Sequence, residues 1–260
     1  MRKISFKNKE NLTLRGYIHE PKIKKEIYDT AFITLHGFPG SCESQNRIRI
    51  ANGLEKKGIL VLRFDFSCTN KSDGNFADKL MSKEVEDIKY AIDFLEKNFK
   101  FKQLILHGAS TGSIDASLYA YRDKRINKLI LSGGIDRLDE CVQLDFSESQ
   151  INDFLTKGYV TYSKRPGEKK NWLHKKKLNK AFYDEYFTLD IPSAIKKYKK
   201  PLLVIHGSHD LDVPLKKGKA LYALANKPKR LHIIKNADHK LTKTKWMNEF
   251  LREAIKFVKD

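Results

Sequence analysis

The segment Gly108-Ala109-Ser110-Thr111-Gly112 carries the clearest chemical signal in this sequence. It has the pattern Gly-x-Ser-x-Gly, and it lies between an apolar stretch expected to be a strand and a stretch expected to be a helix. A sharp strand-to-helix turn would expose the Ser110 hydroxyl above a sheet, and the flanking glycines would relieve crowding in the turn. We therefore interpret Ser110 as a candidate nucleophile, with an ordinary turn of small residues as the alternative.

A serine hydroxyl needs a base to remove its proton, and the base needs a carboxylate to orient it. Of the eight histidines, His239 is the best placed, because it follows the last expected strand and precedes the final helix. Asp210 follows another expected strand and gives the chain order Ser, Asp, His. Asp212 competes with it but could cap a turn or a helix. Asp238 is less suitable because it adjoins His239.

An acyl-transfer site also needs two backbone donors for the negatively charged oxygen that develops on the substrate. The loop from His36 to Gly40 follows an earlier expected strand and would lie beside the candidate nucleophile. The backbone amides of Phe38 and Thr111 are our candidate donors. We interpret His36 itself as a packed or loop-bonding residue rather than a catalytic one.

The histidines and cysteines form no recognisable metal-binding pattern. His206, His209 and Asp210 are close in sequence, but no further ligands at a recognised spacing accompany them. The chain has three widely spaced cysteines, which argues against a disulfide framework. The first ten residues lack the apolar core of a secretory signal, and no apolar run approaches membrane-spanning length. We therefore expect no metal, no membrane span and a reducing cytoplasmic location.

The length of 260 residues and a hydrophobic content of 40% predict one main domain. A formal net charge of +19 could suggest nucleic-acid binding, but the lysines are spread along the whole chain. No zinc finger, aromatic RNA-binding pattern or helix-turn-helix signature accompanies them. We therefore interpret the charge as solvated surface and expect no nucleic-acid partner.

The elements that must position these residues alternate along the chain. After an opening hairpin, short apolar stretches predict buried strands at residues 31–35, 59–64, 103–106, 128–131, 202–205 and 231–234. Between and after them, helical spacing of apolar residues predicts helices at 44–56, 83–98, 111–121, 214–224 and 244–258. This alternation predicts an α/β fold with a mostly parallel sheet between helices.

One long insertion interrupts the alternation. Residues 137–200 contain no clear strand, and they are too many for an ordinary connection. We expect a cap over the carboxyl edge of the sheet, inserted into a core domain of residues 1–136 and 201–260. Within the cap, residues 153–162 could pair as a short hairpin, whereas 178–187 and 192–198 look helical.

These motifs together resemble the α/β-hydrolases, in particular the serine aminopeptidase-like and monoacylglycerol lipase-like group. The resemblance is carried by the motifs already named and by two further segments, Arg63-Phe64-Asp65-Phe66 and Ser72-Asp73-Gly74. It extends from the first hairpin to the last helix, apart from the insertion. Within the group, the chain looks most like small bacterial cinnamoyl and feruloyl esterases. That resemblance implies hydrolysis of carboxylic esters without a cofactor.

The chain departs from the family pattern in two places. Cys68-Thr69-Asn70 stands where the family usually has Gly-x-Gly, so a loop beside the site could be shaped differently. The cap resembles the family only in its size. Tyr183 could correspond to a cap tyrosine that contacts substrate in those esterases, and an ordinary packing aromatic is the alternative.

The cap also carries a cationic stretch of its own, comprising Lys164, Arg165, Lys169, Lys170, Lys175, Lys176, Lys177 and Lys180. Our hypothesis is that this stretch favours anionic substrates, and the alternative is a solvated face. We expect a serine hydrolase that acts on a small-molecule ester through an acyl-enzyme, as a monomer or homodimer. The alternatives are an acyltransferase, thioesterase or peptidase using Ser110, Asp210 and His239, or a non-catalytic binding protein.

Overall fold

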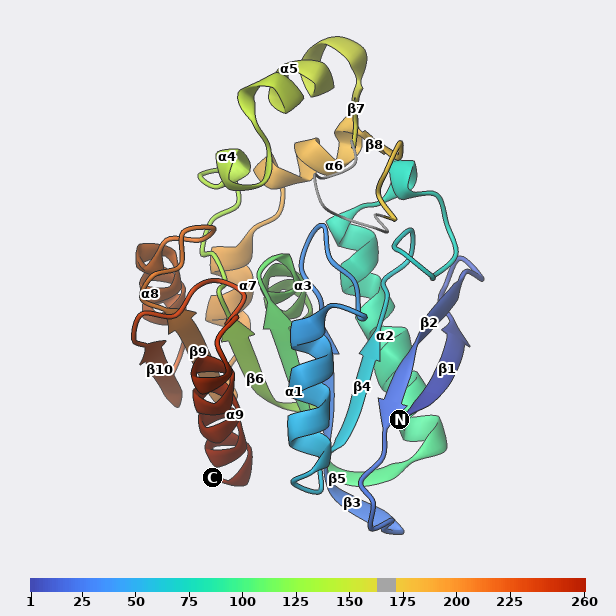
Figure 1. Ribbon diagram of the computed structural model, residues 1–260, viewed down its shortest axis with the longest axis vertical. Coiled ribbons are helices and arrows are strands. Elements are labelled where there is room, and N and C mark those ends of the chain that lie inside the picture. The colour runs from blue at the N-terminus through green and yellow to red at the C-terminus, as the bar shows by residue number, and fades with distance from the viewer. Residues whose placement is uncertain (163–171) are drawn as a thin grey trace.

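The computed structural model describes residues 1–162 and 172–260, and an eight-stranded sheet forms its centre (Figure 1). The spatial order is β1-β2-β4-β3-β5-β6-β9-β10. The first hairpin is antiparallel and β2 also runs antiparallel to β4, whereas all other neighbouring strands are parallel. The strands are β1 (Arg2–Lys7), β2 (Thr13–His19), β3 (Ile27–Leu35), β4 (Leu60–Phe64), β5 (Lys100–Ala109), β6 (Ile126–Ser132), β9 (Leu202–Gly207) and β10 (Lys229–Ile234).

Alternating side chains of the central strands enter two separate apolar layers. In β3, Phe32 packs into one layer and Ile33 into the other; in β5, Ile105 faces the side opposite Leu104 and Leu106. Successive side chains of a strand point to opposite faces, so a strand buried on both faces needs a continuous apolar run. These runs in the sequence are therefore explained by helices on both faces of the sheet, and the predicted α/β fold with a mostly parallel sheet is confirmed.

Two helices, α1 and α9, cover one face, and α2, α3, α7 and α8 cover the other (Figure 1). The amphipathic final helix buries Trp246, Met247 and Phe250 against the first face, as its helical spacing predicts. The bounds of these helices are α1 (Gln45–Glu55), α2 (Met81–Asn98), α3 (Thr111–Ala120), α7 (Ile191–Lys197), α8 (Leu215–Leu224) and α9 (Thr244–Lys259).

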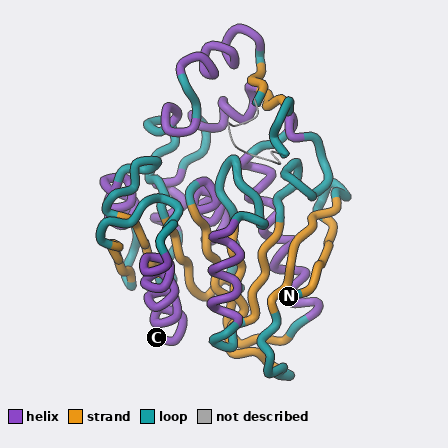
Figure 2. Tube along the Cα trace, viewed as in Figure 1, coloured by secondary structure: helices purple, strands orange, loops and turns teal. Residues whose placement is uncertain are grey.

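Between β6 and α7 the chain forms small elements beyond the carboxyl edge of the sheet, at the top of Figure 2. These are α4 (Val142–Asp145), α5 (Glu148–Lys157), β7 (Tyr159–Thr161), β8 (Lys177–Asn179), α6 (Lys180–Asp184) and the 3-10 helix η2 (Glu185–Phe187). They form a local aromatic cluster, in which Phe146 contacts the rings of Phe154, Phe182 and Tyr186. A further 3-10 helix, η1 (Phe76–Asp78), precedes α2.

The expectation of a hairpin over residues 153–162 is wrong. Helix α5 occupies the first part of that stretch, because Ser147 and Gln150 form a reciprocal capping box at its start. The helix ends at Gly158, whose φ of 77° suits a residue without a Cβ. Only Tyr159–Thr161 is extended, and it pairs antiparallel with Lys177–Asn179 rather than within the predicted segment.

The contacts that attach these small elements to the sheet domain include a hydrogen-bonded carboxylate and an aromatic pair. The Glu185 carboxylate accepts hydrogen bonds from the backbone N–H groups of Met81 and Ser82, at the start of α2. The Phe182 ring lies 4.9 Å, centroid to centroid, from the ring of Phe38, which belongs to the loop after β3. The small elements therefore contact both helix α2 and the loop after β3, which lies at the carboxyl edge of the sheet.

No helix in the described part of the chain is long and apolar enough to cross a membrane. Cys42, Cys68 and Cys141 are all buried as free thiols. Burial raises the pKa of Cys68 and of Cys141 to about 11, so neither thiol is poised to react as a thiolate near neutral pH.

Candidate active site

Ser110 occupies a strained turn between β5 and α3. Its φ of 54° and ψ of −129° lie outside the regions that side chains ordinarily prefer. The turn is tight: a Cβ on Gly108 would stand 2.0 Å from the carbonyl oxygen of Gly112, and a Cβ on Gly112 would stand 2.5 Å from that of His36. Ser110 N–H donates to the carbonyl oxygen of Ser132, with the nitrogen and oxygen 2.9 Å apart, which ties the turn to β6. The two motif glycines are thus required sterically.

The loop after β3 lies directly against this turn. A Cβ on Gly37 would stand 2.7 Å from the Cβ of Ser110, so only glycine lets the two segments approach this closely. Within the described residues, neither the Phe38 nor the Thr111 backbone N–H donates a hydrogen bond. Both residues line the same cavity as Ser110. Two unused donors therefore remain beside the candidate nucleophile.

His239 and Asp210 form a direct hydrogen bond, with Nδ1 of His239 2.8 Å from Oδ2 of Asp210. The Asp210 side chain is almost completely buried, whereas 13% of the His239 side chain is exposed. Burial by itself would raise the pKa of Asp210, but hydrogen bonds from His206 and His239 outweigh it and lower the pKa to about 2. The carboxylate is therefore ionised throughout the neutral range, and His239 lines the cavity with Ser110.

The competing candidates have other contacts. Asp212 is exposed, and its backbone N–H donates to Oδ1 of Asp210. Asp238 accepts hydrogen bonds from the backbone and the hydroxyl of Thr242 within its own turn. His36 is buried beneath the site, and burial lowers its pKa to about 3, which suits the packing role expected for it. His209 is exposed beside Ser208.

The candidate residues open into a cavity of about 720 Å³. Its apolar wall includes Ile114, Ile135 and Leu144. Among the described residues, the cap contributes one carboxyl group to its lining, that of Asp145, which accepts a hydrogen bond from the Tyr186 hydroxyl at 2.7 Å. Burial raises the pKa of Asp145 above its usual range. In the described part of the chain, no group of three or more His, Cys, Asp or Glu side chains is arranged to hold a metal ion.

Sequence reasoning missed two residues at this site, Gly133 and Asp145. Gly133 follows β6 with a φ of 54°, and a Cβ there would stand 2.9 Å from Cε1 of His239. The Ser132-Gly133-Gly134 stretch after a predicted strand could have indicated this close approach. No comparable signal marks Asp145, since the cap lacks a recognisable pattern.

The structure places Tyr183 in α6, where its ring stacks on Phe154 at 5.2 Å between centroids. Tyr183 is not among the described residues that line the cavity. Of the cationic stretch, Lys175, Lys176, Lys177 and Lys180 are described and do not line the cavity either. Lys164, Arg165, Lys169 and Lys170 lie outside the described residues. A substrate contact by Tyr183 and the influence of the lysines both stay predictions.

The loop after β4 adopts a turn of the kind that glycine adopts most easily. Cys68 has a φ of 61° and Asn70 a φ of 47°, although neither is a glycine. The Asn70 amide donates to Oδ2 of Asp65 at 2.9 Å, and the Cys68 N–H donates to the carbonyl oxygen of Asp73 at 2.8 Å. The two positions where the family pattern has glycine therefore have left-handed backbone in this chain, although they carry side chains.

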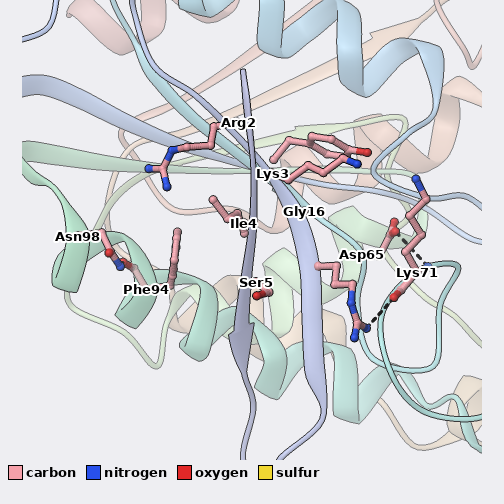
Figure 3. A pocket seen from close by; sticks show the side chains of 11 residues that line it. Arg2, Lys3, Ile4, Ser5, Gly16, Asp65, Lys71, Phe94 and Asn98 are labelled. Carbon is pink, nitrogen blue, oxygen red and sulfur yellow. Dashed lines mark hydrogen bonds between the residues drawn. The ribbon is translucent and has the colours of Figure 1, made fainter.

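A second cavity, of about 620 Å³, lies beside the β1–β2 hairpin (Figure 3). Arg2, Lys3, Arg15 and Lys71 contribute to its lining. Three of these cations are already paired, Arg2 with Glu20, Arg15 with Asp73 and Lys71 with Glu43. None of the candidate catalytic residues lines this second cavity. Ser110 and His239 line the first cavity, and Asp210 is hydrogen-bonded to His239, so the first cavity is the candidate active site.

Fold and site together define an α/β-hydrolase. Residues 28–185 match the family model described as serine aminopeptidase, S33, and the chain therefore belongs to this family. The resemblance found in the sequence is thus confirmed. Residues 148–260 also match the prolyl oligopeptidase family model.

Individual proteins are similar to this chain over most of its length. An uncharacterized 31.7 kDa protein of Escherichia coli is 24% identical over 273 residues, which cover 92% of each chain. The structure is similar to that of Est1E from Butyrivibrio proteoclasticus with ferulic acid bound, with 23% identity, a TM-score of 0.77, and coverage of 97% of this chain and 99% of that one. It is also similar to an esterase of Pyrococcus furiosus, with 22% identity, a TM-score of 0.72, and coverage of 99% and 90%. The solved structures show the shared fold, and the family membership supports a hydrolase.

Proposed function

We propose that this protein is a serine hydrolase that cleaves carboxylic esters through an acyl-enzyme. The observation that carries the proposal is the 2.8 Å hydrogen bond between a buried, ionised Asp210 and His239, which lines one cavity with Ser110 on its strained turn. A base held in one tautomer by a carboxylate is what a serine hydroxyl requires for activation. The family match supports this assignment.

In the proposed reaction, the Ser110 oxygen attacks the ester carbonyl carbon while Nε2 of His239 accepts the hydroxyl proton. The negative charge that develops on the carbonyl oxygen is stabilised by the N–H groups of Phe38 and Thr111, which donate to no other described residue. His239 then donates its proton to the leaving alcohol. Water attacks the acyl-enzyme with His239 again acting as base, which releases the acid and restores Ser110.

The cavity supports a small-molecule substrate of mixed polarity. A volume of about 720 Å³ with an apolar wall and a few polar groups is typical of small-molecule sites. Arg49 and Lys240 line it together with Asp145 and Asp212, so both signs of charge border the site. The preference for anionic esters is a hypothesis about the cap lysines, and replacing Lys175, Lys176 and Lys177 by glutamate tests it. Turnover of anionic esters should then fall more than turnover of neutral ones, and equal effects would remove the idea.

We also propose a reducing compartment, the cytoplasm, as the place of action, because all three cysteines are buried as free thiols. A monomeric or homodimeric state stays a prediction, and size-exclusion chromatography with light scattering tests it.

The main experiment is a panel of chromogenic esters that vary in acyl length, aromaticity and charge, assayed on the wild type and on Ser110→Ala. A fluorophosphonate probe should label the wild type at Ser110 and leave Ser110→Ala unlabelled. Failure of the wild type both to react with the probe and to hydrolyse any ester would favour a non-catalytic binding protein.

A peptidase is the second candidate, because both family models that match carry peptidase names. The same nucleophile would attack an amide, and cap shape would select the substrate. Aminoacyl and dipeptidyl chromogenic amides, together with a thioester, should be assayed beside the ester panel. A higher kcat/KM for amides than for any ester would assign the peptidase activity instead.

A further inference from the structure

A second histidine, His206, contacts the carboxylate that orients His239. It is in β9, its side chain is fully buried, and its strand neighbour in β10 is Ile233. The Nε2 atom lies 2.9 Å from the carbonyl oxygen of Val213 and 3.3 Å from Oδ2 of Asp210. His206 is not among the described residues that line the candidate cavity. It lines a small adjoining cavity of about 30 Å³ together with Ser110, Asp210 and His239, and it contacts Asp210 directly.

The surroundings of His206 determine which nitrogen carries the hydrogen. Both neighbours of Nε2 are oxygen acceptors, so Nε2 must be the donor and its N–H is shared between Val213 and Asp210. The other nitrogen, Nδ1, is buried without a hydrogen-bond partner among the described residues. A Cβ on Gly218 would stand only 2.2 Å from it. The ring therefore fills the space that a side chain at Gly218 would occupy.

The hydrogen bonds of Asp210 divide between its two oxygens. Oδ1 accepts from the backbone N–H groups of Asp212 and Val213, at 3.1 and 2.7 Å. Oδ2 accepts from Nδ1 of His239 and is approached by Nε2 of His206. The oxygen that orients the candidate base thus has His206 as its second donor. The Val213 carbonyl, which also accepts from His206, belongs to the same turn as Asp210. One N–H of His206 therefore contacts both the Asp210 carboxylate and the backbone of its turn.

We propose that His206 is a positioning residue for the catalytic triad of Ser110, His239 and Asp210. Gly218 leaves the space that the His206 ring requires. This inference rests on the proposed function, since it assigns a role in orienting His239. By holding Oδ2 in place, His206 keeps the imidazole aligned towards Ser110 in both chemical steps. Loss of this support should lower kcat and leave KM nearly unchanged, because His206 does not line the cavity.

The first test compares His206→Leu with His206→Gln in the full chain. Leucine removes the donor, whereas the glutamine amide can place an N–H near the position of Nε2. We expect His206→Leu to lower kcat by roughly ten- to a hundredfold, the scale on which a misplacement of about 1 Å acts. Glutamine should restore most of that loss. His19→Leu is a matched control, because His19 is an equally buried strand histidine that bonds Arg63 and Glu55 instead.

A second variant changes the position of His206 without altering its chemistry. Gly218→Ala should displace the ring and lower kcat with little change in KM, while His19→Leu should affect stability alone. If Gly218→Ala and His206→Leu both retain wild-type kcat, or if leucine and glutamine at position 206 impair kcat equally, the positioning role is wrong.

Proton NMR supplies a readout that does not depend on turnover. The Nδ1–H of His239 bonded to Asp210 should give a low-field signal, assigned by its loss in Asp210→Ala. The signal should persist in His206→Gln and shift or broaden in His206→Leu. An unchanged signal in His206→Leu would overturn the inference. Absence of phosphonate labelling and of ester hydrolysis in the wild type would instead contradict the proposed function, and the NMR comparison would still test His206.

Discussion

Gly133 and His239 are in contact across the site: a Cβ at position 133 would stand 2.9 Å from Cε1 and 3.1 Å from Nδ1 of the imidazole. Gly133 also has a φ of 54°. We therefore predict that Gly133→Ala displaces His239 and lowers kcat/KM by roughly a hundredfold, the effect of a misplacement near 1 Å. Steady-state assays on the best ester of the panel measure this.

Gly58→Ala is the matched control for that variant. Gly58 has a φ of 82°, so alanine meets the same kind of backbone strain, but nothing lies within 4 Å of its Cβ position. In both variants the free energy of unfolding should fall by about 1 kcal/mol or more, because alanine is strained at a positive φ. Only Gly133→Ala should lose activity, and equal activity in the two variants would contradict the contact argument.

Asp210→Asn should reduce kcat by about 10⁴-fold, the loss seen when a triad aspartate is neutralised and the histidine tautomer is no longer held. The pKa of Asp210 is lowered to about 2, so the wild-type carboxylate is ionised from weakly acidic to basic pH. The loss should therefore be similar at every pH in that range. Asp212→Asn should stay close to wild type, because that exposed side chain does not bond His239. A larger loss in Asp212→Asn would reverse the assignment of the carboxylate.

Stability should depend on pH through Glu84, which is buried at the start of α2 and paired with Lys79. Burial raises the pKa of Glu84 from 4.5 to about 7. Between these values the folded protein holds the proton and the unfolded chain releases it, so this group favours folding less as pH rises. We predict that Glu84→Gln removes the pH-dependent contribution of Glu84 to the unfolding free energy. Urea unfolding at about pH 5 and about pH 7.5, near the two ends of that range, would measure the change.

The quantity to compare is the change in unfolding free energy between the two pH values, since removal of the Lys79 partner also alters absolute stability. Glu86→Gln, on the exposed side of the same helix, serves as control and should keep the wild-type change. An identical pH dependence in Glu84→Gln and the wild type would show that Glu84 is not protonated in the folded protein.

Glu185 should hold the small cap elements on α2. Its carboxylate accepts from the Met81 and Ser82 N–H groups, as a capping side chain does, so Glu185→Ala should cost about 1 kcal/mol. Urea unfolding measures the loss, and limited proteolysis should become faster within residues 137–200. Asp184→Ala, which removes an exposed partner of Lys180, is the control. Equal protease sensitivity in the two variants would argue against a role of Glu185 in attaching the cap elements to α2.

The positions of Ser110, Asp210 and His239 were predictable because each follows a strand whose apolar run is visible in the sequence. The carboxyl ends of parallel strands meet at one edge, so residues far apart in the chain converge there. Local motifs therefore sufficed to predict the fold and the proximity of these residues. Their catalytic roles stay predictions for the experiments above.

Other features depend on contacts that no local pattern encodes. The role of Gly133 follows from a positive φ and from a neighbour about a hundred residues away in the chain. Asp145 comes from the cap, whose short elements are built around an aromatic cluster rather than a repeated pattern. The hairpin expected over residues 153–162 was wrong because the prediction rested on threonine and aromatic content, whereas the capping box at Ser147 starts a helix that occupies the first part of this stretch.

The sheet ends at β1, whose outer backbone groups have no neighbouring strand in the described structure. Three of its six residues are cations, namely Arg2, Lys3 and Lys7. Two molecules that met along this margin would have to bring these like charges together before their backbones could pair. The charges on β1 therefore oppose edge-to-edge pairing of the sheets of two molecules. Added salt should weaken this effect by screening the repulsion.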